Sequence, residues 1–272
     1  MKILDGRELV GYIKERQAKQ VRGLRQAWHV LPKLAIIIAN NDPVIDTYVR
    51  LKERYGEDIL IDVDVYRVAQ AVVAERIEQL NHDETVHGIV VQLPLQNPEE
   101  TDAIVALIHP DKDVDGLGPQ AAFTSATATA IDWLLAGYNV ALKDREIAIV
   151  GRGRLVGAPL ARLWLNAGLT VASYDETATD LQSDLRKADI IVTATGVPGL
   201  ITSSMVSPGK VVVDAGTASE NGAIVGDVAV DVRERNDLTI TPEKGGVGPL
   251  TVAALFDNVM TAARKTIPAD QQ

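Results

Sequence analysis

The chain has 272 residues, which is enough for one large domain or two smaller ones, each with its own core. Its formal net charge of −10 argues against general binding to nucleic acids or anionic membranes, because both need a basic face. It contains no cysteine, so disulfides, thiolate nucleophiles and cysteine-ligated zinc are excluded.

The sequence gives no sign of a metal site or of a targeting segment. The four histidines lack ligand-like spacing, and they are His29, His82, His87 and His109. Residues 1–10 lack the apolar core of a signal peptide. No apolar run reaches the 18 residues that indicate a transmembrane helix. We therefore expect a cytoplasmic protein that holds no metal.

Short apolar segments alternate with longer segments of helical pattern in the first part of the chain. The predicted helices are residues 4–24, 46–58 and 74–83, and the predicted strands are residues 33–39, 59–68 and 87–95. A helix and then a loop rich in Pro, Gly and Asp follow over residues 97–120, which suits a domain boundary or the edge of a site. This alternation is typical of a parallel α/β fold.

The alternation restarts after residue 120. The predicted helices there are residues 126–140, 156–168, 179–188 and 249–265, and the predicted strands are residues 146–151, 169–174, 189–196 and 210–216. We therefore predict an α/β protein of two lobes with mostly parallel sheet. Residues 1–120 form the N-terminal lobe, joined by the C-terminal segment 249–272, and residues 121–248 form a Rossmann-like lobe.

A glycine-rich turn at residues 147–157 (IAIVGRGRLVG) gives the strongest local motif. Gly151, Gly153 and Gly157 follow a strand and open a helix, with a spacing one residue longer than the usual dinucleotide fingerprint. Such glycines let the chain turn tightly and approach a pyrophosphate at the helix N-terminus. The alternative is a glycine-rich turn that binds no ligand.

The next two strands support a dinucleotide. Asp175 follows the second strand, 24 residues after Gly151, where a carboxylate can accept hydrogen bonds from the adenosine ribose. A carboxylate at that place would repel the 2′-phosphate of NADP, so NAD is favoured over NADP. The third strand ends in TATG (residues 193–196), which puts another glycine at a carboxyl edge.

Polar residues of the first lobe form a second candidate site. Tyr48 and Lys52 lie four apart on a predicted helix, so they share one face. Gln92 lies near the end of a strand, and Asp113 and Asp115 follow in an Asp-rich loop. A buried lysine with a lowered pKa can act as an acid–base. Spacing alone equally allows solvated surface residues and an ordinary turn.

A third glycine-rich stretch, TPEKGGVGPLT (residues 241–251), leads into the last helix. On spacing alone it is either a hinge between the lobes or a loop that contacts a ligand.

Eight stretches of the chain, in this order, resemble the bifunctional methylenetetrahydrofolate dehydrogenase/cyclohydrolase family almost end to end. They are LDGRELV (4–10), NNDPVIDTYVRLK (40–52), VHGIVVQLPL (86–95), HPDKDVDG (109–116), GRGRLVGAPLARLWLNAG (151–168), ADIIVTATGVPGLI (188–201), VVVDAG (211–216) and GGVGPLTVAAL (245–255). Any one of these stretches is weak evidence, but their combination is specific.

The resemblance implies roles for the matching residues. Lys52 would be the acid–base lysine, Tyr48 would stack on or orient the folate, and Gln92 would position the lysine. Asp115 would hold the pterin ring. The implied catalytic residues are therefore Lys52, Gln92, Tyr48 and Asp115. The implied substrate-binding residues are Tyr48, Gln92, Leu93, Pro94, Asp115, Gly245, Gly246, Pro249 and Thr251. The implied cofactor-binding residues are Gly151, Arg152, Gly153, Val156, Gly157, Asp175, Thr195, Gly196 and Thr217.

The same resemblance implies a two-step reaction and a homodimer. Hydride would leave the one-carbon bridge of methylenetetrahydrofolate for NAD or NADP, giving a methenyl cation. Water would then add to that cation and the ring would open to the 10-formyl product. A single cleft would help both steps through proximity. The first lobe would thus be the catalytic, folate-binding domain.

Several stretches depart from the family pattern. The family usually has Gly-Arg-Ser where residues 151–153 are Gly-Arg-Gly, and a His-Ser-Arg/Lys-Thr-like stretch where residues 175–178 are DETA. The other departures are SATA (125–128) behind a shortened loop, GLGP (116–119) and PEKGG (242–246). Two alternatives stay open. One is a divergent member that keeps only one activity or has changed substrate, and the other is a non-catalytic dinucleotide-binding module.

Overall fold

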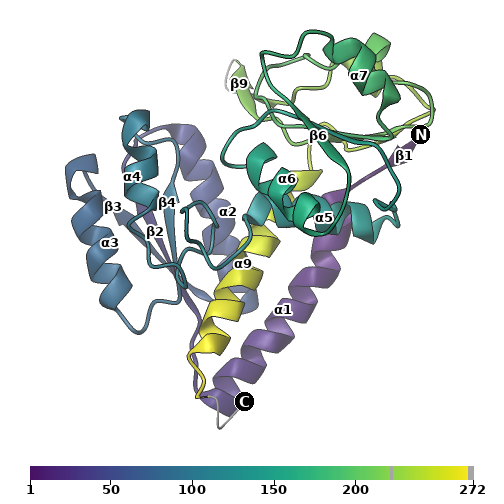
Figure 1. The fold of residues 1–272 in the computed structure, drawn as a ribbon. Helices are drawn as coiled ribbons and strands as arrows, with labels where there is room; N and C mark the ends of the chain where they lie inside the picture. The colour runs from purple at the N-terminus through teal and green to yellow at the C-terminus, as the bar shows by residue number, and fades with distance from the viewer. Residues whose placement is uncertain (221–222, 269–272) are drawn as a thin grey trace. The chain divides into compact units, whose positions relative to one another are not determined.

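The computed structural model describes residues 1–220 and 223–268, which form two compact units (Figure 1). The six-stranded unit contains Met1–Val10 and Thr127–Thr251, and the three-stranded unit contains Gly11–Ala126 and the described residues from Val252 onward. Each unit has its own parallel sheet and helices. None of the described helices is long and apolar enough to cross a membrane.

The three-stranded unit is built on a parallel sheet in the order β3-β2-β4. Its strands are β2 (Lys33–Ile38), β3 (Asp62–Arg67) and β4 (Gly88–Gln92). Its helices are α2 (Pro43–Ile59), α3 (Val73–His82), α4 (Thr101–Val105), most of α1 (Gly6–Trp28) and most of α9 (Val247–Lys265), with short 3-10 turns at Gln70–Val72 and Pro98–Glu100. Strand β2 is buried almost throughout because it lies in the centre and is covered on both faces.

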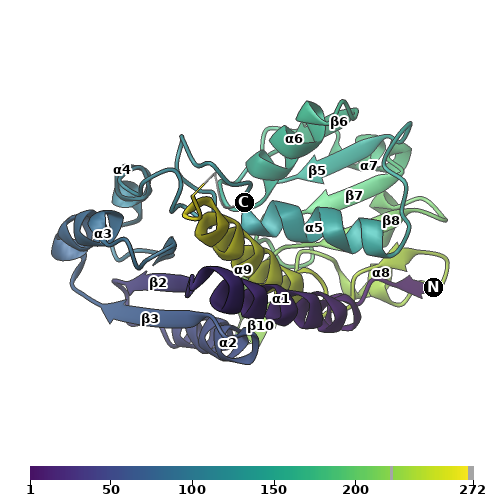
Figure 2. The same ribbon diagram turned by 90° about the horizontal axis from the view of Figure 1, so that it is seen from below.

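The two faces of this sheet pack against different helices (Figure 2). Ala35 and Ile37 point to the face that α3 covers with Ile77. Leu34 points to the opposite face, in register with Val63, and there α2 comes so close that a Cβ on Gly56 would lie 2.6 Å from the Val63 side chain. The period-2 alternation of the strand thus decides which helix each residue contacts.

A buried polar contact ties α1, α2 and α9 together within this unit. The Gln17 side chain is fully buried and its amide nitrogen donates to the Ala253 carbonyl at 2.8 Å. The Tyr55 hydroxyl donates to Gln17 Oε1 at 2.7 Å, and the Tyr55 ring stacks on Phe256 with 5.2 Å between centroids. Because the buried amide has partners, its hydrogen bonds offset the cost of removing it from water, and they hold the three helices together.

The six-stranded unit has a sheet in the order β1-β11-β8-β7-β5-β6, with every pairing parallel. Its strands are β1 (Lys2–Ile3), β5 (Ile147–Val150), β6 (Val171–Tyr174), β7 (Ile190–Thr193), β8 (Val211–Asp214) and β11 (Thr239–Ile240), and β9 (Ala218–Glu220) with β10 (Ala223–Val225) forms a separate hairpin. The helices are α5 (Ala126–Gly137), α6 (Gly157–Asn166), α7 (Leu181–Lys187) and α8 (Val230–Arg233), with a 3-10 turn at Ser203–Met205.

Strand order in this sheet reverses at β5. Strand β6 lies on one side of β5 and β7 lies on the other, so the connections after β5 and β6 run in opposite directions. In doubly wound sheets such a reversal leaves a crevice at the carboxyl ends of the strands, where ligands bind. One face of the sheet packs on Leu185 of α7 and Val232 of α8. Among the helices, Trp164 of α6 donates to Asp132 of α5 at 2.9 Å.

The predicted fold class, α/β with two units and mostly parallel sheet, is confirmed. The boundaries differ from the prediction. Residues 1–10 were predicted in the N-terminal lobe, but the structure groups them with the six-stranded unit because Lys2 and Ile3 pair with Thr239 and Ile240. The breaks lie after Ala126 and after Thr251, inside α9, rather than at 120 and 248. Residues 269–272 of the predicted C-terminal segment lie outside the described residues.

Candidate active site

Lys52 lies in the buried stripe of α2. The buried residues Ile45, Val49, Gly56 and Ile59 recur at helical spacing, and Lys52 occupies the place between Val49 and Gly56 in that stripe. Its side chain is therefore directed inward instead of into solvent. Lys52 Nζ donates to Oε1 of Gln92, the last residue of β4, at 2.9 Å. The two residues that the sequence placed 40 positions apart are thus in direct contact.

Strand β4 also brings Asp115 to this place. Asp113 forms a parallel bridge with Ile89 of β4, and the Ile89 amide donates to the Lys112 carbonyl at 2.8 Å. The segment that ends in Asp115 therefore runs alongside β4 in the direction of Gln92. This arrangement gathers an amine, an amide and a carboxylate at the carboxyl end of the sheet.

The electrostatics of this group favour proton exchange. Burial lowers the pKa of the Lys52 ammonium, and the negative charge of Asp115 partly opposes that shift. Burial raises the pKa of the Asp115 carboxyl, and the positive charge of Lys52 opposes it in turn. Burial also raises the pKa of the half-buried Tyr48 phenol, one turn before Lys52 on α2. A lysine with a lowered pKa can both accept and donate a proton nearer to neutral pH.

Asp113 differs from Asp115, although the sequence presents them as a similar pair. The Asp113 carboxylate is buried and accepts hydrogen bonds from the backbone amides of Gly116, Leu117 and Gly118, the shortest at 2.7 Å. Asp113 therefore stabilises the conformation of its own loop. Asp115 is left as the carboxylate that acts on Lys52.

Two residues that the sequence did not suggest hold this loop on the end of α3. Lys112 Nζ donates to the carbonyl oxygens of Leu80, Asn81 and Asp83 at 2.9, 2.9 and 2.7 Å. The Asn81 side chain donates to the Leu107 carbonyl at 2.8 Å and accepts from the His109 amide at 2.9 Å. A lysine ammonium can satisfy the carbonyls at a helix C-terminus that have no partner within the helix. Lys112 lies 29 to 32 residues further along the chain than these carbonyls, so no local sequence signal indicates the contact.

The turn after β4 contains the predicted substrate residues Leu93 and Pro94. Gln92 Nε2 donates to the Leu93 carbonyl at 3.2 Å, and the Asn40 side chain donates to the Pro94 carbonyl at 3.1 Å. Asn40 follows β2, so it connects the ends of two neighbouring strands. These contacts fix the amide of Gln92 with its oxygen toward Lys52.

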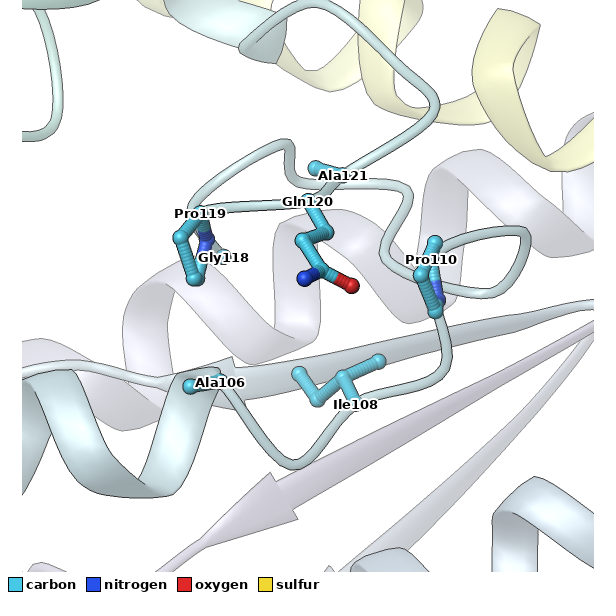
Figure 3. A pocket seen from close by; sticks show the side chains of 7 residues that line it. All are labelled: Ala106, Ile108, Pro110, Gly118, Pro119, Gln120 and Ala121. Atoms are coloured by element: carbon cyan, nitrogen blue, oxygen red, sulfur yellow. The ribbon is translucent and has the colours of Figure 1, made fainter.

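A hollow of about 220 Å³ lies between the end of α4 and the loop that follows Asp115 (Figure 3). It is lined by Ala106, Ile108, Pro110, Gly118, Pro119, Gln120 and Ala121. Figure 3 shows the Gln120 side chain pointing toward Ile108. The lining contains no charged side chain, so the hollow offers none of the acid–base chemistry of the Lys52 group.

The glycine motif of the six-stranded unit forms a cradle at the end of β5. Gly151 has φ of +104°, and a Cβ there would lie 2.4 Å from the Ala194 carbonyl oxygen. A Cβ on Gly157, the first residue of α6, would lie 1.9 Å from the Gly151 carbonyl oxygen. Only glycine fits at either place, and the turn leads directly into a helix N-terminus. The residues present therefore fit a dinucleotide pyrophosphate.

The third glycine, Gly153, is in open space, with no atom within 4 Å of a Cβ built there. Its neighbour Arg152 donates to the Ser173 carbonyl at 2.7 Å and pairs with Asp175 at 3.0 Å. Asp175 also accepts hydrogen bonds from the Thr177 hydroxyl at 2.6 Å and from its amide. The Thr177 hydroxyl is the main cause that lowers the pKa of Asp175, and Arg152 adds to it. The Asp175 side chain is therefore ionised, and it forms an ion pair with the Arg152 guanidinium.

The remaining predicted cofactor residues lie at the ends of neighbouring elements. Thr195 and Gly196 follow β7, Thr217 follows β8, and the half-buried Val156 directly precedes α6. A Cβ on Gly196, which has φ of +70°, would lie 3.5 Å from the Thr217 carbonyl oxygen. The loops after β7 and β8 thus lie side by side at the edge where the cradle is.

The predicted folate loop, with Gly245, Gly246, Pro249 and Thr251, belongs to the six-stranded unit. Gly245 has φ of +91° and its carbonyl accepts from the Gly6 amide at 2.9 Å. Pro249 and Thr251 lie in the first turns of α9. In the described part of the chain, no group of three or more His, Cys, Asp or Glu side chains is arranged to hold a metal ion.

The fold and these sites define an α/β protein with one unit whose glycine cradle fits a dinucleotide and one unit that carries a half-buried lysine. The sequence profile of the tetrahydrofolate dehydrogenase/cyclohydrolase catalytic domain matches residues 4–115, and that of the NAD(P)-binding domain of the same family matches residues 125–267. The chain belongs to the tetrahydrofolate dehydrogenase/cyclohydrolase family, which confirms the resemblance that the motifs indicated.

Individual relatives agree with this assignment. The bifunctional protein FolD of Exiguobacterium sibiricum is 35% identical over 275 residues, which cover 96% of this chain and 99% of the relative. The crystal structure of the bifunctional FolD enzyme of Campylobacter jejuni is 36% identical, with a TM-score of 0.90 over 97% of this chain and 99% of its own. The FolD enzyme of Trypanosoma brucei, complexed with NADP cofactor and inhibitor, is 31% identical, with a TM-score of 0.91 over 98% of each chain.

Proposed function

We propose that this protein oxidises 5,10-methylenetetrahydrofolate to the methenyl compound with a nicotinamide dinucleotide, and hydrolyses that compound to 10-formyltetrahydrofolate. The contact of Lys52 with Gln92, beside Asp115, carries this proposal. Perturbed pKa values are typical of functional sites, and burial lowers the pKa of this half-buried amine within a stripe of apolar residues. The relatives that are named bifunctional, over nearly the whole chain, support the same pair of activities.

In this proposal Lys52 moves the protons of the hydrolytic step. Its neutral amine accepts a proton from the water whose oxygen bonds to the methenyl carbon. The ammonium then returns a proton to N5 as the bond between N5 and that carbon breaks, and the remaining hydroxyl proton leaves to solvent as the formyl carbonyl forms. Gln92 Oε1 holds the lysine nitrogen in place, Tyr48 orients the folate, and Asp115 binds its pterin ring. When bound, the nicotinamide supplies the acceptor for the hydride of the first step.

A paired assay tests these roles. Purified protein is mixed with methylenetetrahydrofolate and NAD or NADP, and both the reduced coenzyme and the methenyl chromophore are followed. Lys52→Met should abolish cyclohydrolase activity and leave dinucleotide affinity intact, while Lys19→Met on the exposed side of α1 should behave as the unchanged protein. Normal hydrolysis by Lys52→Met would refute the role of Lys52. Turnover in one step only would favour the single-activity alternative, and dinucleotide binding without turnover would favour the non-catalytic one.

NAD is the proposed coenzyme, in preference to NADP. Asp175 is ionised and lies directly after β6, where it can bind the ribose hydroxyls and repel a 2′-phosphate. It also pairs with Arg152, a cation that could otherwise bind that phosphate. Asp175→Ser should therefore raise kcat/KM for NADP relative to NAD. An unchanged ratio would remove Asp175 from coenzyme selection.

Two further predictions accompany this proposal and rest on the family resemblance and the sequence. A homodimer is expected, and analytical ultracentrifugation of the purified protein would test it. The cytoplasmic location also stays a prediction, which cell fractionation would test.

A further inference from the structure

We infer that the buried carboxylates Asp214 and Asp227 position the two loops that hold the nicotinamide half of the coenzyme, so that Asp227 and its partner Thr193 are positioning residues for the dehydrogenase. The inference rests on the proposed function, because it concerns the coenzyme of that reaction. Asp214, Asp227 and Thr193 are not among the predicted coenzyme-binding residues, and all three lie inside the six-stranded unit.

Asp214 joins the end of β8 to the segment before α8. Its side chain is almost fully buried and pairs with Arg233 of α8. Its carboxylate also accepts from the backbone amides of Gly216, Asp227 and Val228, at 3.0, 3.0 and 3.1 Å. Burial raises the pKa of Asp214, and the backbone amides of Asp227 and Val228 and the charge of Arg233 oppose that rise. Four donors from three segments therefore converge on one carboxylate.

Asp227 makes the next connection, to β7. It is fully buried, and its Oδ2 accepts from the Thr193 hydroxyl at 2.6 Å and from the Thr195 amide at 2.7 Å. Its other oxygen, Oδ1, is buried without a hydrogen-bond partner among the described residues. Leaving a carboxylate oxygen unpaired costs stability, so natural proteins retain such groups where they serve a purpose.

Two glycines lock the carboxylates against the opposite segments. A Cβ on Gly216 would lie 2.0 Å from Asp227 Oδ1, and a Cβ on Gly226 would lie 2.1 Å from Asp214 Oδ2. Each carboxylate thus fills the space that a side chain would take on the other's loop. The network therefore fixes the separation of the loops after β7 and β8 as well as their hydrogen bonding.

These loops are the ones that contain Thr195, Gly196 and Thr217. The Thr195 amide is bound directly by Asp227, and Gly196 lies against the Thr217 carbonyl. If the Thr193–Asp227 hydrogen bond is lost, the Asp227 carboxylate is held less firmly. Its hydrogen bond to the Thr195 amide then fixes the loop less well, at the place where the nicotinamide is expected. Coenzyme binding, and not the hydrolytic step at Lys52, should then suffer.

Thr193→Val, Thr193→Ser and Asp227→Asn in the full chain test this inference. Thr193 is fully buried in β7, and valine has the same shape without the hydroxyl. We expect Thr193→Val and Asp227→Asn to raise the dissociation constant of NAD, measured by calorimetry, and its KM by at least fivefold. Thr193→Ser should restore both within twofold, and the rate of methenyltetrahydrofolate hydrolysis should stay within twofold throughout.

Three results would overturn the inference. The first is unchanged NAD affinity in both Thr193→Val and Asp227→Asn. The second is a NAD affinity of Thr193→Ser as weak as that of Thr193→Val. The third is a loss of methenyltetrahydrofolate hydrolysis as large as the loss of NAD affinity, which indicates general unfolding. The proposed function has a different failure. If the unchanged protein binds neither NAD nor NADP, that proposal fails and this inference falls with it. If the unchanged protein binds NAD and the variants bind it equally well, the inference alone is wrong.

Discussion

Gln92→Leu should impair the hydrolytic step by removing the acceptor of the Lys52 amine. Leucine has nearly the shape of glutamine, so β4 and its packing are kept. The 2.9 Å bond from Lys52 Nζ to Gln92 Oε1 is lost, and a half-buried amine is left with one acceptor fewer. The ammonium is then less well stabilised, and the pKa of Lys52 falls further below its ordinary value.

The expected loss follows from the strength of this bond. A hydrogen bond to a charged group contributes roughly 1.5–3 kcal/mol. If that contribution is lost from the transition state, kcat/KM falls roughly 10- to 140-fold, because about 1.4 kcal/mol corresponds to a factor of ten. The dissociation constant of NAD should not change, because Gln92 belongs to the three-stranded unit and the glycine cradle to the other.

Hydrolysis of methenyltetrahydrofolate is followed by the loss of its chromophore, over a range of pH. Gln92→Glu is the informative partner, since a carboxylate beside Lys52 raises its pKa where leucine lowers it. The two variants should displace the pH dependence in opposite directions. Gln79→Leu, on the exposed face of α3, is the matched control. Gln92→Leu activity within threefold of the unchanged protein, with an unshifted pH profile, would refute a positioning role for Gln92.

Two other variants test the contacts that hold the loop before Asp115 on α3 and the glycine cradle before α6. Lys112→Met removes the donor to three carbonyls at the end of α3, so it should lower the free energy of unfolding by roughly 1–3 kcal/mol in urea and reduce hydrolysis. Unchanged stability would contradict that anchoring role. Gly157→Ala should weaken NAD binding in calorimetry at least tenfold, because the new Cβ would meet the Gly151 carbonyl at 1.9 Å. Gly11→Ala, at an exposed position of α1 where a new Cβ meets nothing within 4 Å, should bind NAD normally, and equal binding by Gly157→Ala and Gly11→Ala would contradict the cradle.

The buried strands and long helices were predictable because each has a strong local signal. The run at 33–39 is apolar over its whole length, as a strand covered on both faces must be, and the structure has β2 at Lys33–Ile38. The two-residue strands β1 and β11 have no periodicity to read. Their pairing across the chain, Lys2 with Thr239, depends on tertiary contacts, so the sequence does not indicate that Lys2 and Ile3 join the six-stranded sheet.

The candidate site shows the same division. The sequence prediction of Lys52 as the acid–base residue depends on motifs that are distant in the chain. The structure adds a physical reason why Lys52 points inward, which is its place in the buried stripe between Val49 and Gly56. Asp113 and Asp115 are indistinguishable by spacing. Only the loop conformation, with three amides directed at Asp113, separates the structural carboxylate from the one that acts on Lys52.

Coupling between Lys52 and Asp115 predicts how the stability of Lys52→Met depends on pH. The pKa of Asp115 is already raised by burial, and Lys52 limits that rise. Methionine removes the limit, so the pKa should rise further. Above pH of about 4 the folded state then binds more protons at Asp115 than the unfolded state does, and stability falls as pH increases.

In urea unfolding, the free energy of unfolding of Lys52→Met should therefore lie further below that of the unchanged protein at pH 8 than at pH 5. The double variant Lys52→Met/Asp115→Asn has no carboxyl to titrate, so this part of the pH dependence should disappear. The opposite order, with a larger deficit at pH 5, would mean that the two side chains are not coupled. Asp115 would then be free to bind the pterin ring without influencing the proton transfers of Lys52.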